Sequence, residues 1–293
     1  MTSLDQFLTR AELLLQRLEH VVPAAPADID WTAPAFRWRM QVGFGVGSAR
    51  GSLLAIAKPA LIRFDDLQHI DEQKKLIRQN TLQFVQGKPA NHVLLTGARG
   101  TGKSSLVKAC LSEFVDQGLR LIEVNKTDLI ELPSILDLLS TRPERFILFC
   151  DDLSFEEGES SYKALKVALD GSLAVSMENC LIYATSNRRH LMPERMAENQ
   201  SYQHGDVGEL HPGETVEEKI SLSERFGLWV SFYSFSQDHY LAIVAHWLRE
   251  FSCSEEQIAQ ARGDALRWAL QRGSRSGRVA SQFARDYVGR LLS

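Results

Sequence analysis

The sequence contains little cysteine and no closely spaced cysteine pair. Its four cysteines lie far apart, and the nearest two, Cys150 and Cys180, are separated by 30 positions. The absence of a Cys-x-x-Cys pair excludes a zinc ribbon and a thioredoxin-like redox site. The N-terminus lacks a basic head followed by an apolar run, so it does not resemble a secretory signal. No apolar run approaches the ~18 residues that a membrane-spanning helix needs. These absences predict a cytoplasmic protein with reduced thiols and no membrane span.

The chain also lacks a large excess of charge of either sign. Across 293 residues, 33 Lys and Arg face 37 Asp and Glu, which gives a formal net charge of −4. This balance excludes a strongly basic protein that coats nucleic acid. A local basic face stays open, because seven arginines between positions 262 and 290 give the C-terminal region a positive bias. We interpret them as a solvated helix face in preference to a DNA-facing surface.

Hydrophobic patterning divides the chain into three regions. An amphipathic helical stretch followed by a proline- and glycine-rich tether predicts a helical N-terminal region and linker over 1–60. Short apolar runs then alternate with helical stretches, which predicts an α/β domain over 61–235. Its strands are expected at 93–96, 119–124, 146–150, 181–184 and 228–233. Such runs are typical of a parallel five-stranded sheet that is covered on both faces. Three helical stretches, at 238–251, 255–271 and 277–291, predict a helical domain over 236–293.

A glycine-rich loop follows the first strand expected in the α/β region. Residues 97–104 are GARGTGKS and match the pattern G-x-x-x-x-G-K-[ST] in full. Such glycines let backbone N–H groups surround phosphate oxygens, and the following helix directs its positive end at the same anion. Lys103 is expected to reach the β- and γ-phosphates of ATP, and the Ser104 hydroxyl to ligate Mg²⁺. The expected phosphate-binding residues are Gly97, Ala98, Arg99, Gly100, Thr101, Gly102, Lys103, Ser104 and Ser105.

Two adjacent carboxylates follow the strand expected at 146–150. In open α/β sheets, ligands bind at the carboxyl ends of the strands, so Asp151 and Asp152 should emerge beside the glycine-rich loop. Asp151 is the expected Mg²⁺ ligand. Asp152 is the candidate base that orients or activates the attacking water.

Three later motifs favour one class of phosphate-loop protein. The strand at 181–184 runs on to Asn187, SERFG precedes the last expected strand, and GRVA opens the last helix. In this order, Asn187, Arg225 and Arg278 resemble the sensor 1, arginine-finger and sensor 2 positions of AAA+ ATPases. The resemblance covers about residues 60–293. The segments GKPANHVLLTGARGTGKSSLVKA, FCDDLSFE and EEKISLSERFGLWVSF are more closely similar to an uncharacterised bacterial family of predicted AAA+ ATPases.

This resemblance implies a fold and a set of roles. The fold is an αβα sandwich of the P-loop NTPase class with a helical C-terminal lid. Asn187 would sense the γ-phosphate, Arg278 would contact it from the lid, and Ile70 would lie near the adenine. Arg225 would enter the site of a neighbouring subunit in a homo-oligomeric ring or arc. Two alternatives stay open: Arg225 as a surface ion-pair partner of a nearby glutamate, and Arg275 in place of Arg278.

One departure from the AAA+ pattern bears on the rate of hydrolysis. Most of these ATPases end the acidic strand with Asp-Glu, whereas this chain has Asp-Asp. Asp152 is one methylene shorter, so its carboxylate falls about 1.5 Å further from a water placed for glutamate. Either turnover is slow, or the backbone advances to compensate for the shorter side chain.

Two hypotheses for function follow. The first is an ATP hydrolase that remodels an unknown protein client. The second is a nucleotide-switched adaptor, or a loader of the DNA-replication type, with little intrinsic hydrolysis. A small-molecule kinase is disfavoured, because it needs neither the lid nor an arginine supplied in trans. Nucleic acid as a partner stays open but is unsupported, because no helix-turn-helix or basic stripe is legible in the sequence.

Overall fold

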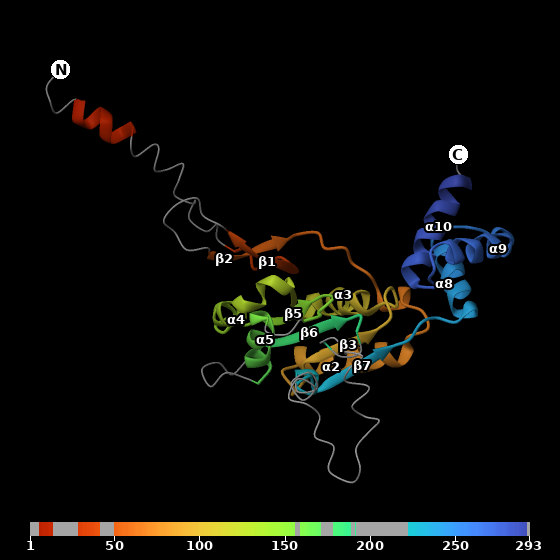
Figure 1. The fold of residues 1–293 in the computed structure, drawn as a ribbon, viewed down its shortest axis with the longest axis horizontal. Helices are drawn as coiled ribbons and strands as arrows, with labels where there is room; N and C mark the ends of the chain where they lie inside the picture. Colours follow the sequence, from red (N-terminus) through yellow and green to blue (C-terminus); the bar gives the residue numbers. More distant parts are fainter. Residues whose placement is uncertain are drawn as a thin grey trace, which may run out of the picture.

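The structure is a computed structural model that describes residues 6–13, 29–41, 50–155, 159–170, 178–188, 191 and 222–291. A seven-stranded sheet forms its centre, in the order β2-β1-β4-β5-β6-β3-β7 (Figure 1). Neighbouring strands are parallel except for β1 and β2, which form an antiparallel pair. The strands are β1 (Ala35–Gln41), β2 (Arg50–Ile56), β3 (Val93–Gly97), β4 (Leu119–Glu123), β5 (Arg145–Cys150), β6 (Cys180–Ser186) and β7 (Leu228–Phe232).

The five strands expected from the sequence are confirmed as β3 to β7, but the prediction of five strands in all is wrong. Strands β1 and β2 lie in the region predicted to be helix and linker, where only residues 6–13 are helical in the described part. Strand β1 alternates buried Phe36 and Trp38 with arginines, which is the period of a strand. The neighbouring prolines and glycines concealed this short pattern. Gly51 on β2 makes room for the indole, because a Cβ there would lie 1.9 Å from the Trp38 ring.

Helices cover both faces of the sheet, as a parallel sheet requires. On β5, Ile147 and Phe149 belong to one hydrophobic core, while Phe146 and Leu148 belong to the other. The first core includes α2 (Asp71–Val85) and α3 (Lys103–Phe114), and the second includes α4 (Leu132–Leu139) and α5 (Ser160–Asp170). Three short 3-10 turns complete these layers: η1 (Phe64–Asp66), η2 (Val115–Gln117) and η3 (Lys126–Glu131).

The three C-terminal helices pack against one another to one side of the sheet (Figure 1). They are α8 (Gln237–Glu250), α9 (Glu255–Gln271) and α10 (Gly277–Leu291), in agreement with the expected helical stretches. Tyr240 of α8 is fully buried and donates its hydroxyl to the carbonyl of Ala265 on α9 at 3.1 Å. The division into domains at 60 and 235 stays a prediction. None of the described helices combines the length and apolarity needed to cross a bilayer.

Candidate nucleotide-binding site

The glycine-rich loop joins the end of β3 to the start of α3 in a conformation that only glycine adopts readily. Gly97, Gly100 and Gly102 have φ angles of 129°, 74° and 104°. A Cβ at Gly97 would also lie 1.9 Å from the backbone oxygen of Phe232 on β7. Within the loop, the Thr101 hydroxyl donates to the carbonyl of Ala98 at 2.8 Å. The loop therefore has the backbone shape that its sequence motif predicts.

Lys103, the first residue of α3, lies within this loop with 5% of its surface exposed. Its Nζ donates to the carbonyls of Gly97 and Ala98 at 2.7 and 2.8 Å, and to Oδ1 of Asn187 at 3.0 Å. Burial lowers the pKa of Lys103, while the nearby carboxylates of Asp152 and Asp151 oppose that shift. The ammonium is thus fixed at the centre of the loop and in contact with the residue that follows β6.

Ser104 and Asp151 meet beside the loop. The Ser104 hydroxyl donates to Oδ1 of Asp151 at 2.6 Å, and the Thr185 hydroxyl donates to the same oxygen at 2.6 Å. Hydroxyl and carboxylate oxygens are the ligands that Mg²⁺ prefers. Among the described residues, no three His, Cys, Asp or Glu side chains gather as a protein-only metal site would require. The donors fit a Mg²⁺ ion whose remaining ligands are phosphate oxygens and water, which is the usual arrangement beside a nucleotide.

Asp152 adopts a left-handed backbone conformation, with φ at 53°. Asn187 donates its amide Nδ2 to one carboxylate oxygen of Asp152, and the Arg99 guanidinium lies 3.9 Å from the other. The backbone N–H of Asp152 donates to the Thr185 hydroxyl at 2.8 Å. More than half of the Asp152 side chain stays exposed to the cavity. The candidate base is therefore held by residues from the loop and from the end of β6.

A cavity of about 780 Å³ lies between the loop and the C-terminal helices. The backbone N–H of Gly277, at the start of α10, donates to the carbonyl of Gly100 at 2.8 Å. Arg278 and Arg285 line the cavity from α10. Arg275 is not among the described residues that line it. This favours Arg278 over Arg275 at the lid. The apolar part of the lining consists mainly of Ile62, Leu67, Ile70, Phe235, Ile243 and Trp247.

The structure brings nearly all of the expected site residues together. Gly97 and Ala98 contact Lys103, and the other expected residues line the cavity: Ile70, Arg99, Gly100, Thr101, Gly102, Lys103, Ser104, Ser105, Asp151, Asp152, Asn187 and Arg278. Arg225 is the exception. It lies away from the cavity lining and its Nε pairs with Asp170 at the end of α5. Arg225 thus forms an ion pair with Asp170. Glu217 and Glu218, two of the glutamates expected as its partners, lie outside the described residues.

Sequence analysis missed Thr185 and Arg285. Residues i and i+2 of an extended segment share a face, and Thr185 in β6 and Asn187 just beyond its end both contact the carboxylates. Arg285 lies seven positions after Arg278, which places both on one face of α10. Both spacings were readable from the sequence.

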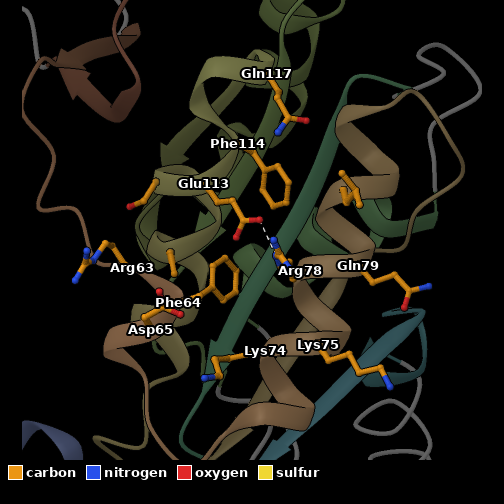
Figure 2. A pocket seen from close by; sticks show the side chains of 13 residues that line it. Arg63, Phe64, Asp65, Lys74, Lys75, Arg78, Gln79, Glu113, Phe114 and Gln117 are labelled. Carbon is orange, nitrogen blue, oxygen red and sulfur yellow. Dashed lines mark hydrogen bonds and ion pairs between the residues drawn. The ribbon is translucent and has the colours of Figure 1, made fainter. Parts of the chain in front are cut away.

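A second cavity, of about 860 Å³, lies between η1, α2 and α3 (Figure 2). Arg78 of α2 and Glu113 of α3 face one another there, with Nε and Oε1 2.6 Å apart. Its described lining residues include none that line the first cavity, and none that sequence analysis assigned to a site. The chemistry expected of this chain therefore lies at the first cavity.

Solved structures of other proteins are similar to this chain in fold. The chain superposes on one point mutant of Thermotoga maritima RuvB with a TM-score of 0.50 and 17% identity, covering 79% of this chain and 67% of that one. A second T. maritima RuvB mutant gives a TM-score of 0.46 and 18% identity, covering 75% and 61% respectively. With the phosphate loop at the end of β3 and the helical lid, the fold is that of an AAA+ P-loop NTPase.

Within this class, the chain belongs to the family described as "Protein of unknown function (DUF815)", whose model matches residues 32–291. The match begins just before β1, so it includes the hairpin that sequence analysis had assigned to a linker. A curated relative, the ATP-dependent zinc metalloprotease FtsH of Burkholderia pseudomallei (strain 1710b), is 27% identical in an alignment of 203 residues that covers 59% of this chain. The matched part is only 30% of the length of that relative.

Proposed function

We propose that this chain binds Mg-ATP in the first cavity and hydrolyses it to ADP and phosphate. One observation carries the proposal: Lys103, Asn187 and Asp152 form a continuous hydrogen-bonded series from the phosphate loop to the acidic strand end. This series brings the Lys103 ammonium, the Asn187 amide and the Asp152 carboxylate together at the same end of the cavity. That constellation suits the transfer of a γ-phosphoryl group to water.

Binding would use the backbone of the loop and the charges around it. Residues 102–105 at the start of α3 line the cavity, where their N–H groups would favour phosphate oxygens. Lys103 would exchange its contacts with the loop carbonyls for contacts with the β- and γ-phosphates. Ser104 and Asp151 would hold Mg²⁺, and Ile70 would contact the base at the apolar part of the cavity. Arg278 would reach the γ-phosphate from the lid.

In the chemical step, the oxygen of a water bonds to the γ-phosphorus while the bond to the bridging oxygen of ADP breaks. Asp152 orients this water and accepts its proton. Asn187 fixes the carboxylate of Asp152 through Nδ2. When bound, Mg²⁺ supplies positive charge that offsets the charge on the phosphate oxygens.

A second candidate, the nucleotide-switched adaptor or loader, is favoured by the state of Asp152. Asn187 engages one of its carboxylate oxygens and Arg99 lies near the other. An aspartate that is both short and engaged by two partners is poorly placed to activate water, so tight binding with slow turnover would result.

The wider role of the chain is also part of the proposal. We place it in the cytoplasm, where ATP turnover would drive remodelling of a protein client. It would assemble as a homo-oligomeric ring or arc in which Arg225 of one subunit completes the site of the next. Nucleic acid is not proposed as the client, because Arg267 and Arg290 pair with acids of their own helices and Arg278 and Arg285 line the cavity.

The experiment is steady-state ATP turnover together with equilibrium ATP binding, for the wild type, Lys103→Ala and Lys108→Ala. Lys108 lies on the same helix but does not line the cavity, so it is the matched control. We expect Lys103→Ala to lose binding and turnover while Lys108→Ala retains both. Equal turnover in Lys103→Ala and the wild type would contradict the proposal. Tight binding with negligible wild-type turnover would select the switch in place of the hydrolase.

A further inference from the structure

Thr185 occupies a position between the two carboxylates of the site. It lies near the end of β6 with 1% of its surface exposed. Its hydroxyl donates to Oδ1 of Asp151 at 2.6 Å and accepts from the backbone N–H of Asp152 at 2.8 Å. One buried oxygen thus contacts both residues that follow β5.

We infer that Thr185 is a positioning residue that sets the location of both carboxylates, the metal ligand Asp151 and the candidate base Asp152. The inference rests on the proposed function. It adds Thr185 as a residue that fixes the position of the metal ligand Asp151 relative to the candidate base Asp152.

The hydrogen-bond directions explain why a hydroxyl is required. The group must donate to a carboxylate and accept from an N–H at the same time, and only a hydroxyl does both from a side chain of this size. Valine has the same shape and the same preference for strands, but it can do neither. Serine keeps both hydrogen bonds and loses only a methyl group.

The backbone around Thr185 reinforces this restraint. The carbonyl of Thr185 accepts from the N–H of Leu153 at 2.7 Å, and the hydroxyl of Ser186 donates to the carbonyl of Leu153 at 2.7 Å. The turn after β5 is therefore tied to β6 on both sides of Asp152. Among these contacts, those of the Thr185 hydroxyl are the ones that reach Asp151 and Asp152.

Thr185 also shares a single acceptor oxygen with Ser104. Both hydroxyls donate to Oδ1 of Asp151. When Ser104 turns to a metal ion, the Thr185 hydroxyl keeps the carboxylate from rotating. The expected consequence is a site whose metal ligand is already oriented before the nucleotide arrives.

The test compares Thr185→Val with Thr185→Ser, and uses Thr81→Val as the matched control. Thr81 is a fully buried threonine on α2 that donates to the carbonyl of Ile77 and has no contact with the carboxylates. For each protein, the Kd for ATP is measured with Mg²⁺ and with EDTA, alongside turnover and the melting temperature. The ratio of the Kd in EDTA to the Kd with Mg²⁺ isolates the contribution of the metal to ATP binding. A general loss of stability does not change this ratio.

We expect Thr185→Val to reduce that ratio by about 10–100-fold, with the Kd in EDTA unchanged and turnover reduced in parallel. Thr185→Ser and Thr81→Val should keep the wild-type ratio within about threefold. Should Thr185→Val not fold, Thr185→Ala removes the same hydroxyl by truncation.

Two results would overturn the inference, one for Thr185 alone and one for the proposed function as a whole. A Thr185→Val protein with the wild-type ratio and turnover overturns the role of Thr185 alone. A wild-type protein that binds ATP in neither condition overturns the proposed function and this inference with it.

Discussion

Ser104 and Asp151 are joined by a 2.6 Å hydrogen bond although they lie 47 positions apart in the chain. Ser104 lies in the first turn of the helix after β3, and Asp151 directly follows β5. Strand β6 lies between these two strands in the sheet. This order explains why residues at the end of β6 contact the phosphate loop on one side and the carboxylates on the other.

Replacing Asp152 by asparagine should separate binding from turnover. Asparagine keeps the size and tolerates the left-handed backbone at this position, but it cannot accept a proton from water. We expect turnover to fall about 100-fold or more, with the Kd for ATP close to the wild-type value. Steady-state turnover and equilibrium binding measure the two effects. Unchanged turnover in Asp152→Asn would show that Asp152 is not the base.

Arg225 should act in a neighbouring subunit, and its intrachain partner Asp170 provides the comparison. If Arg225 serves only the ion pair, Arg225→Ala and Asp170→Ala should have the same effect. If it completes a neighbouring site, Arg225→Ala should reduce turnover about 10³-fold, while Asp170→Ala should not. Turnover is measured over a series of protein concentrations, and the wild-type specific activity should rise as the protein assembles. Specific activity that does not depend on concentration would contradict the trans role.

Gly97 should tolerate alanine far less well than Gly118, although both have positive φ angles. At Gly118, with φ at 88°, no atom lies within 4 Å of an added Cβ, so the cost is backbone strain of about 1–2 kcal/mol. At Gly97, the same atom would also lie 1.9 Å from the backbone oxygen of Phe232, which adds about 1–3 kcal/mol. The free energy of unfolding in urea, measured for Gly97→Ala and Gly118→Ala, gives both costs. Equal losses of unfolding free energy in Gly97→Ala and Gly118→Ala would show that β7 shifts to accommodate the methyl group.

Stability should fall in mild acid because of His92. Its Nδ1 accepts from the backbone N–H of Ile182 at 3.0 Å, and burial lowers its pKa from 6.5 to about 4. Between these two values the unfolded chain binds a proton that the folded chain does not. The contribution of neutral His92 is therefore fully present above pH 6.5, and it is lost as the pH falls toward 4.

The size of this effect is on the order of 3 kcal/mol. The measurement is the free energy of unfolding from about pH 7.5 to about pH 4.5, for the wild type and for His92→Asn, whose side-chain oxygen can accept the same hydrogen bond. The loss in acid should be smaller in His92→Asn. Parallel curves for the two proteins would assign the acid sensitivity to other groups.

Much of the fold was predictable because β3 to β7 are short runs rich in apolar residues that alternate with helical stretches. The phosphate loop was predictable because its glycines and Lys103 are close in sequence. Strands β1 and β2 were not, since β1 is identified by its pairing with β4 as much as by its own pattern. The ion pair between Arg225 and Asp170 was also hidden, because the two residues lie 55 positions apart and no local pattern links them.

The hairpin of β1 and β2 has a practical consequence for any shortened form of this protein. Residues Ala35 to Arg37 of β1 pair with Leu121 to Glu123 of β4, and Arg37 forms an ion pair with Glu123. A chain that began after the hairpin would leave β4 as an open edge, with unpaired backbone groups beside the apolar Ile122. Exposed edges of this kind recruit strands from other molecules, so such a protein would aggregate. Soluble expression of this fold thus requires that the chain start upstream of Ala35.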